Sequence, residues 1–274
     1  MLIDFEQKFR EYLTEYEDQN DIEKDRLEQI APELYLDWLA SPKDWLAGKS
    51  PVNYYEDFEP GALIEELGKY ILSEISLPGV LLNRIADDKE ETYPFLVRLL
   101  TGYDGEKADA VKIAIIRLIE EMDLPHPYDY YLEAITESSE QSDLAEACAQ
   151  ELKNSGDAYT QSIIAAFESS ENNYVADCLL DILSDIPYDP RTFALAMEKF
   201  LYSDTHQAFY ASCLGKIGNE KALPFLEEAL RSEDVAYYDY VAMKNALEAL
   251  GGEIDIERDF TGDNDYESLK ELRK

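Results

Sequence analysis

The stretch ASCLGKIGNEKALPFLEEALRSED, residues 211–234, contains two helical patterns joined by a sharp boundary. Gly218 stands where the first pattern stops, and glycine adopts the left-handed conformation of a helix end more readily than other residues. Pro224 follows shortly afterwards, and proline is favoured in the first turn of a helix because its missing N–H has no partner there. The stretch therefore predicts a helix, a short turn and a second helix.

The apolar pattern of that second helix recurs along the chain. Two adjacent apolar residues, two variable ones and a further apolar residue lie along one side of a helix. The pattern occurs at Leu63-Ile64-x-x-Leu67, Phe95-Leu96-x-x-Leu99, Tyr131-Leu132-x-x-Ile135, Ile163-Ile164-x-x-Phe167, Ala196-Met197-x-x-Phe200 and Phe225-Leu226-x-x-Ala229. Its second residue recurs at intervals of 32, 36, 32, 33 and 29 residues. This spacing predicts repeated helical units.

A second helix follows each of these segments, marked by two apolar or small residues four positions apart. The pairs are Leu81/Ile85, Ile115/Ile119, Cys148/Leu152, Cys178/Ile182, Cys213/Ile217 and Ala246/Leu250. A lone pair of helices cannot bury both apolar stripes, whereas stacked pairs cover each other, which is the physical basis of an α-solenoid. We therefore predict an all-α fold that contains six helix pairs.

The repeats divide the chain into three predicted segments. Residues 1–58 contain no repeat of this type and are predicted to form an N-terminal helical cap, in which Trp38 and Trp45 pack against the first repeat. Residues 59–252 hold the six helix pairs. Residues 253–274 form an acidic C-terminal tail, which is predicted to cover the last hydrophobic face or to remain mobile.

The three cysteines occupy the same position in three successive second helices, where the last repeat has Ala246. Packed helices lie about 8–10 Å apart, whereas a zinc ion requires thiolates at about 2.3 Å. The spacing therefore excludes a shared metal ion and favours a packing role, because a small apolar side chain lets a neighbouring helix approach closely. Cys148, Cys178 and Cys213 do not form a disulfide framework, which is typical of a reduced, cytoplasmic protein.

The C-terminal repeats resemble the HEAT-like repeat first described in phycobilisome lyases. The matching residues are Ala211, Leu214-Gly215, Ile217-Gly218, Ala222-Leu223-Pro224, Leu226, Ala246-Leu247 and Ala249-Leu250-Gly251. The resemblance covers about residues 205–252, and the upstream repeats are assigned by their spacing. It implies a right-handed α-α superhelix. The family contains scaffolds, adaptors, lyases and regulatory subunits, so the resemblance implies no single function.

Charge restricts the class of partner. The chain has 60 acidic and 24 basic residues, with a formal net charge of −36. Such a surface repels phosphate backbones and anionic membranes, so we expect no binding to nucleic acid or membrane. No apolar run reaches the ~20 residues of a membrane helix, and the start MLIDFEQKFREY lacks the pattern of a signal peptide. We expect a cytoplasmic protein whose partner is a basic protein or peptide.

The triplet Gly48-Lys49-Ser50 matches the end of a phosphate-binding P-loop, but its surroundings do not. A P-loop requires a glycine at the position of Lys43, a preceding strand and free backbone amides, whereas Pro51 has no amide hydrogen. We interpret the triplet as a helix boundary, in which Gly48 ends one helix and Ser50 is the N-cap of the next.

Two kinds of acidic pattern are candidate partner-binding sites. Tyrosines cluster with aspartate at 128–131 and 237–240, and tyrosine rings can anchor interfaces and attract cations. The alternative is that each cluster starts a helix with alternate tyrosines buried. Aspartates spaced by four at 177–185 form a stripe that either meets a cationic partner or is an ordinary solvated face. The candidate residues are Asp177, Asp181, Asp185, Tyr128, Tyr130, Tyr237, Tyr238 and Tyr240.

No catalytic constellation is recognised. The sequence contains no serine–histidine–acid set, CxxC pair or glycine-rich nucleotide loop, so we predict no catalytic residue, cofactor or metal site. HEAT-like iron hydroxylases use His-Glu dipeptides as ligands, whereas here His126 precedes Pro127 and His206 precedes Gln207.

Three functional hypotheses are compatible with these patterns. The first is a non-catalytic scaffold or adaptor whose acidic concave surface binds a basic protein or peptide. The second is an immunity-type inhibitor that masks a basic protein by imitating the charge of nucleic acid. The third is a lyase-like enzyme of the phycobilisome-lyase type. The oligomeric state stays open between a monomer and a weak dimer, because an exposed apolar stripe at either end favours stacking.

Overall fold

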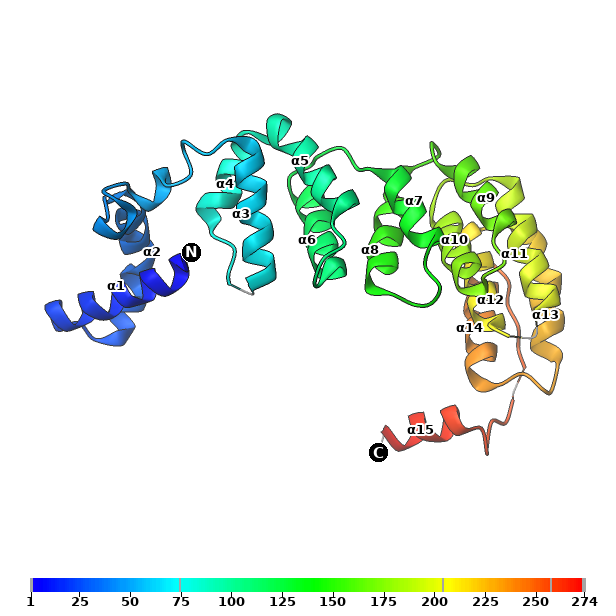
Figure 1. The fold of residues 1–274 in the computed structure, drawn as a ribbon. Helices are drawn as coiled ribbons and strands as arrows, with labels where there is room; N and C mark the ends of the chain where they lie inside the picture. Colours follow the sequence, from blue (N-terminus) through cyan, green and yellow to red (C-terminus); the bar gives the residue numbers. More distant parts are fainter. Residues whose placement is uncertain (1, 74, 204, 257, 273–274) are drawn as a thin grey trace. The chain divides into compact units, whose positions relative to one another are not determined.

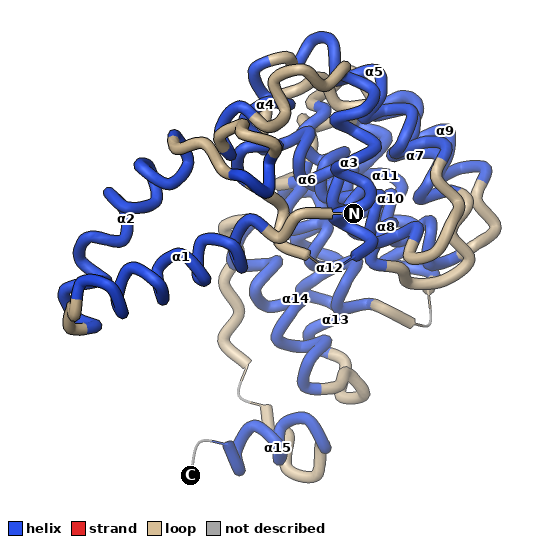
Figure 2. Tube along the Cα trace, turned by 60° about the vertical axis from the view of Figure 1, so that its left-hand side comes forward, coloured by secondary structure: helices blue, strands red, loops and turns tan. Residues whose placement is uncertain are grey.

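The computed structural model describes residues 2–73, 75–203, 205–256 and 258–272, and every regular element within these ranges is a helix (Figures 1 and 2). This confirms the predicted all-α class. The contacts divide the chain into two compact units, Met1–Pro127 and Tyr128–Lys274. The boundary between them falls within the segment that carries the repeats.

The first unit begins with a helical hairpin and continues with two helix pairs. Its elements are α1 (Phe5–Asn20), α2 (Lys24–Ala40), η1 (Asp44–Leu46), η2 (Pro51–Asn53), α3 (Pro60–Ser73), α4 (Gly79–Asp87), α5 (Lys89–Gly102) and α6 (Ala108–Glu121). Helix α3 contacts α4, α5 and α6, so each pair in this unit packs against the next.

Aromatic side chains hold the N-terminal hairpin together. Trp38 is buried and its ring lies 5.4 Å from Phe9 and 6.3 Å from Trp45 between ring centroids. Both tryptophans thus contact aromatic residues of the cap itself. The contact with the first repeat is made by Tyr70 of α3, whose hydroxyl donates to the carbonyl of Ile3 at 2.7 Å.

The second unit contains the remaining helices. They are α7 (Tyr128–Thr136), α8 (Asp143–Leu152), η3 (Lys153–Ser155), α9 (Thr160–Ser169), α10 (Asn173–Asp185), α11 (Pro190–Tyr202), α12 (Gln207–Ile217), η4 (Glu220–Ala222), α13 (Leu223–Arg231), α14 (Tyr237–Ala249) and α15 (Asn264–Leu272). Helix α10 contacts α8 and α12, and α12 contacts α14 (Figure 1). In this unit the second helix of each pair therefore lies beside the second helix of the following pair.

The predicted apolar stripes contribute to the core to different extents, and in α5 only Leu96 of the stripe is buried. In α3, α9 and α11 all three stripe residues are buried. The last stripe differs, because Phe225 is exposed and α13 buries Leu226 and Leu230. Leu226 and Leu230 are four residues apart and therefore lie on the same side of this short helix, whereas Phe225 is displaced from that side.

Local boundaries follow the expected chemistry. Gly218 has φ +74° and ends α12, with its N–H bonded to the carbonyl of Leu214 at 3.2 Å. Pro224 lies in the first turn of α13. Side chains of Ser142, Asn172 and Asp189 accept hydrogen bonds at the starts of α8, α10 and α11. The predicted helix–turn–helix at 211–234 is therefore confirmed.

Helices α12 and α14 approach closely at a glycine. A Cβ atom added to Gly215 would lie 3.1 Å from the Cα atom of Ala246 and 3.2 Å from its Cβ atom. Both positions are in the second helices of successive pairs, where small residues were predicted. Cys213 and Ala246 are buried here, as is Cys148 in α8, whereas Cys178 of α10 is only half-buried.

The C-terminal tail covers the N-terminal end of α14. The Phe260 ring lies 5.1 Å from both Tyr237 and Tyr240 between centroids. The guanidinium of Arg258 donates to the carbonyls of Glu233 and Val235 and lies over the Tyr240 ring. Arg258 and Phe260 of the tail therefore pack against residues at the start of α14.

We expect Gly215→Val to lower the free energy of unfolding by about 1–3 kcal/mol, because overpacking a tight contact forces the backbones apart. Urea denaturation followed by far-ultraviolet circular dichroism measures the change. Gly102→Val is the matched control, since a Cβ atom there meets nothing within 4 Å. Equal destabilisation by the two variants would contradict the proposed role of the α12–α14 contact.

Candidate partner-binding surfaces

The aspartate stripe of α10 forms an internal ion-pair network. Asp181 accepts from the ammonium groups of Lys153 at 2.7 Å and Lys216 at 2.8 Å. Asp185 lies 2.8 Å from the same Lys153 nitrogen and 3.0 Å from that of Lys216. Two carboxylates and two ammonium groups therefore balance each other and link η3, α10 and α12.

The third aspartate of the stripe has its partners at the start of α12 and at the residue before it. Asp177 accepts from the Tyr210 hydroxyl at 2.8 Å and lies 2.8 Å from Nδ1 of His206. Burial, together with the hydrogen bond to Asp177, raises the pKa of Tyr210 to about 12. Tyr210 therefore stays a neutral donor at neutral pH, and Asp177 is held against the start of α12.

The pKa values show that the network favours its charged form. Burial alone raises the pKa of Asp181, but the hydrogen bonds and charges of Lys153 and Lys216 outweigh it, so the pKa is lowered. Burial likewise lowers the pKa of each lysine, but hydrogen bonds to Asp181 and Asp185 outweigh it and raise the value. The network therefore stabilises the fold above the ordinary carboxyl pKa, and this stabilisation is lost as the pH falls through the lowered value. On the alkaline side it is lost as the pH rises through the raised lysine values.

These contacts change how the predicted stripe is interpreted. The aspartates were proposed to face a basic partner, whereas in the structure Asp181 and Asp185 pair with lysines of the chain itself. Asp177 contacts Tyr210 and His206. Lys153 lies 28 residues before Asp181 and Lys216 lies 35 residues after it, which is about one repeat in each direction. That spacing was the signal in the sequence by which these lysines could have been found.

The second tyrosine cluster is largely covered. Tyr240 is buried, and its hydroxyl donates to the carbonyl of Ile256 at 3.3 Å. Tyr237 packs against Phe260 and Tyr266, with centroids 5.1 and 5.3 Å away. Tyr238 alone is strongly exposed, at 54%. This cluster therefore serves mainly to hold the tail, as in the alternative that treats such tyrosines as core.

The first tyrosine cluster lies beside an open groove. Tyr128 and Tyr130 are half-exposed at the start of α7, and the Tyr128 ring lies 5.2 Å from that of Tyr159. The Tyr159 hydroxyl donates to Asp129 at 3.0 Å. The groove runs between α7 and α9, has a volume of about 570 Å³, and is lined among others by Asp129, Glu133, Thr136, Ser169 and Ser170. We call it the α7–α9 groove.

The lining of the α7–α9 groove combines carboxylates with hydroxyl groups. Its two carboxylates belong to one helix and are four residues apart, so they lie on the same side of α7. Hydroxyl groups of α7 and α9 line the same groove and can accept or donate hydrogen bonds. Carboxylates, hydroxyls and neighbouring tyrosine rings are groups that interact favourably with lysine and arginine.

The triplet Gly48-Lys49-Ser50 is a helix boundary, as predicted. Gly48 has φ +84° and follows η1, while Ser50 and Pro51 occupy the N-cap and first position of η2. Both neighbouring helices are short 3-10 turns, and the Ser50 side chain makes no capping hydrogen bond. Lys49 forms an ion pair with Asp57 at 2.7 Å.

The thiols are suited to packing. Burial raises the pKa of Cys178 and raises that of Cys213 to about 12. Because the thiolate is the nucleophilic and metal-binding form, a raised pKa disfavours reaction or metal binding by Cys178 and Cys213 at neutral pH. Cys148, Cys178 and Cys213 form no disulfide with one another.

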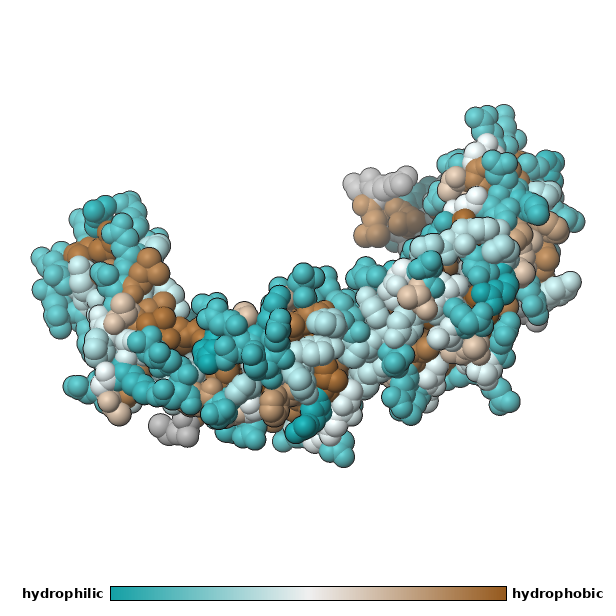
Figure 3. Space-filling model, turned by 90° about the horizontal axis from the view of Figure 1, so that it is seen from above, coloured by the Kyte–Doolittle hydropathy of each residue, from teal (hydrophilic) through white to brown (hydrophobic). Residues whose placement is uncertain are grey.

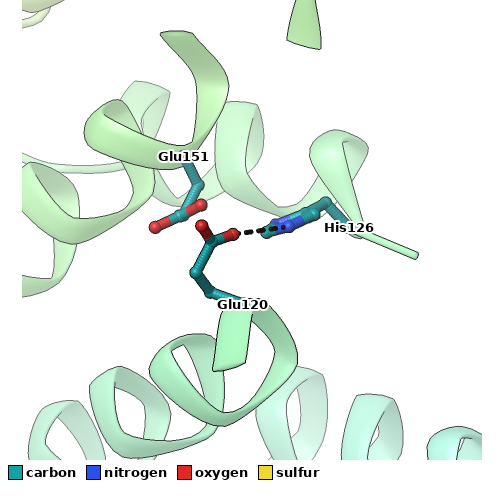
Figure 4. A group of neighbouring side chains, drawn as sticks. All are labelled: Glu120, His126 and Glu151. Atoms are coloured by element: carbon teal, nitrogen blue, oxygen red, sulfur yellow. Dashed lines mark ion pairs between the residues drawn. The ribbon is translucent and has the colours of Figure 1, made fainter. Parts of the chain in front are cut away.

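His126 is paired with an acid of the preceding helix. Its Nε2 lies 3.1 Å from a carboxylate oxygen of Glu120, which is at the C-terminal end of α6 (Figure 4). The His126 side chain is 14% exposed and that of Glu120 55%. Glu151, which is also drawn in Figure 4, belongs to the second unit.

Hydrophilic residues cover much of the face drawn in Figure 3. Among the described residues, no helix combines the length and the apolar character needed to span a bilayer. No family model, curated protein or solved structure matches the chain.

We expect Asp181→Asn to lower the free energy of unfolding at pH 7 by about 1 kcal/mol, because the partly exposed network lies between a surface pair and a buried one. The difference in the free energy of unfolding between the variant and the wild type should shrink as the pH falls below the ordinary carboxyl pKa of 3.8. Urea denaturation at several pH values tests both expectations.

Glu198→Gln on α11 is the matched control, because it removes one exposed negative charge from the same unit. Equal effects of the two variants at pH 7, or a difference that does not change with pH, would contradict a specific role for Asp181.

Proposed function

We propose that the chain is a right-handed HEAT-like α-solenoid and acts as a non-catalytic scaffold for a basic protein or peptide. The solenoid is supported by the order of contacts, in which α8, α10, α12 and α14 are successive neighbours. The Gly218–Pro224 boundary and the close α12–α14 approach at Gly215 also support it, because both lie where the chain resembles that repeat.

The observation that carries the functional proposal is the α7–α9 groove. The acids of α10 are balanced by Lys153 and Lys216, whereas Asp129 and Glu133 line an open groove beside tyrosine rings. The groove lies in a chain with a formal net charge of −36, whose field attracts cations over several ångströms. We propose that lysine and arginine side chains of the partner bind Asp129 and Glu133.

The physics of such an interface predicts strong salt dependence. Exposed ion pairs are screened at a Debye length of about 8 Å at physiological ionic strength. Electrostatic complementarity raises the association rate and excludes anionic competitors more than it raises affinity. Tyrosine rings beside the carboxylates supply apolar area and cation–π contacts, which salt weakens less.

We expect the double variant Asp129→Asn/Glu133→Gln to bind the basic partner about tenfold more weakly, since two ion pairs at a rim are worth about 0.2–1 kcal/mol each. The partner is first captured from host lysate by the wild type, eluted with a salt gradient and identified by mass spectrometry. Its affinity for each variant is then measured by calorimetry at two salt concentrations.

Glu198→Gln/Glu228→Gln is the matched control, because it removes two exposed negative charges from α11 and α13 of the same unit. Equal weakening by both double variants would show that only net charge matters. A captured partner that is acidic, or whose binding does not depend on salt, would overturn the proposal. If the captured partner is a basic nuclease, the result would favour the second hypothesis, in which the chain is an immunity-type inhibitor.

A further inference from the structure

A second cavity lies in the N-terminal unit, between the hairpin α1–α2 and the start of α4. It has a volume of about 310 Å³ and is lined by Phe5, Glu6, Phe9, Tyr35, Pro78 and Val80, among others. Phe5, Pro78 and Val80 are buried, whereas Glu6 is exposed at the edge. We call this cavity the aromatic pocket.

The wall of the aromatic pocket consists of interlocked rings. Phe9 and Tyr35 are 4.8 Å apart between centroids at 70°, and Phe5 lies 6.1 Å from Trp45 at 64°. In such edge-to-face pairs the rings are fixed at steep angles to one another. The lining of the pocket is therefore mainly apolar, with Glu6 as its one carboxylate.

The same ring cluster already binds a cation of the chain. The ammonium of Lys43 lies 5.4 Å from the Trp38 ring centroid and 5.5 Å from that of Tyr12. Both of these rings contact Phe9, at 5.4 and 6.1 Å. A lysine side chain is thus held by rings adjacent to those that line the pocket.

The chemistry of the pocket selects the charge of its ligand. An anion would meet the Glu6 carboxylate and the field of a chain with net charge −36. A purely apolar ligand would bring no charge to the carboxylate at the edge. A cation with a hydrocarbon stem suits both the aromatic rings and the carboxylate, because its stem packs on the rings and its charge lies near Glu6.

The present partner of Glu6 can be replaced. Arg10 lies 2.8 Å from Glu6 one helical turn away, and the two side chains are 63% and 54% exposed. Exposed pairs of this kind contribute little and are readily exchanged. An incoming ammonium group can therefore take the place of Arg10.

We propose that the aromatic pocket binds a lysine side chain of the basic partner. The proposal rests on the proposed function for the existence of that partner, but the pocket itself is tested without it. The lysine stem would lie among Phe5, Phe9 and Val80, and its ammonium group would meet Glu6. The pocket thus adds a site in the first unit to the α7–α9 groove of the second.

The direct test uses n-butylammonium, which has the four-carbon stem and charged head of lysine. The chain has two tryptophans, Trp38 and Trp45, and both rings belong to the cluster beside the pocket, so tryptophan fluorescence reports on occupancy. We expect n-butylammonium to bind at least about fivefold more tightly than 1-butanol, and butyrate not to bind. Equal binding of 1-butanol, or no saturable change with n-butylammonium, would overturn the proposal.

Two variants locate the binding. Gly79→Leu should weaken n-butylammonium binding at least about fivefold by filling the pocket, because Gly79 lines it and a Cβ atom there meets nothing within 4 Å. Glu6→Gln should weaken it about threefold by removing the carboxylate. Gly102→Leu and Glu11→Gln are the matched controls and should leave binding unchanged, and unchanged binding in Gly79→Leu would also overturn the proposal.

The n-butylammonium test and the partner-capture test can fail independently of each other. If n-butylammonium binds as expected but no basic partner is found, the pocket stands and the scaffold proposal fails. If a basic partner binds the α7–α9 groove while n-butylammonium does not bind, only the aromatic pocket is rejected.

Discussion

Packing between neighbouring helices buries the apolar stripes of this chain, and within each of the two units helices of one pair contact helices of the next. Leu63 and Leu67 of α3 are completely buried in a unit where α3 contacts α4, α5 and α6. In the second unit α12 lies against both α10 and α14. The contact between α12 and α14 is tight at Gly215, because a Cβ atom there would lie 3.1 Å from the Cα atom of Ala246.

The same packing determines which acidic groups are available at the surface. Residues about one repeat apart are brought together, so Lys153 and Lys216 meet Asp181 from both neighbouring helices. The acids of α10 therefore contribute to stability, while Asp129 and Glu133 of α7 line an open groove. A chain with 60 acidic residues thus divides them between internal ion pairs and surfaces that can attract a partner.

Aromatic residues act where a stack of helices ends. In the first unit, the hydroxyls of Tyr55 and Tyr70 lie 3.2 Å apart and connect the cap to α3. In the second unit, Phe260 and Arg258 cover Tyr240 of α14. Large rings suit this role because they bury much area and still offer a polar group. At the N-terminal end they also leave a pocket with a carboxylate at its edge.

The sequence by itself determined the helical class, the apolar stripes of α3, α9 and α11 and the boundary residues, because these depend on periodicity and on backbone preferences within a few positions. Gly218, Pro224 and the Gly48–Pro51 boundary lie where local chemistry places them. The partners of charged and aromatic side chains were decided only by the tertiary structure. Asp181 and Lys216 are 35 residues apart, and Tyr240 and Phe260 meet across a turn of irregular chain. Such contacts depend on how neighbouring helices rotate and how closely they approach, and periodicity along a single helix does not contain that information.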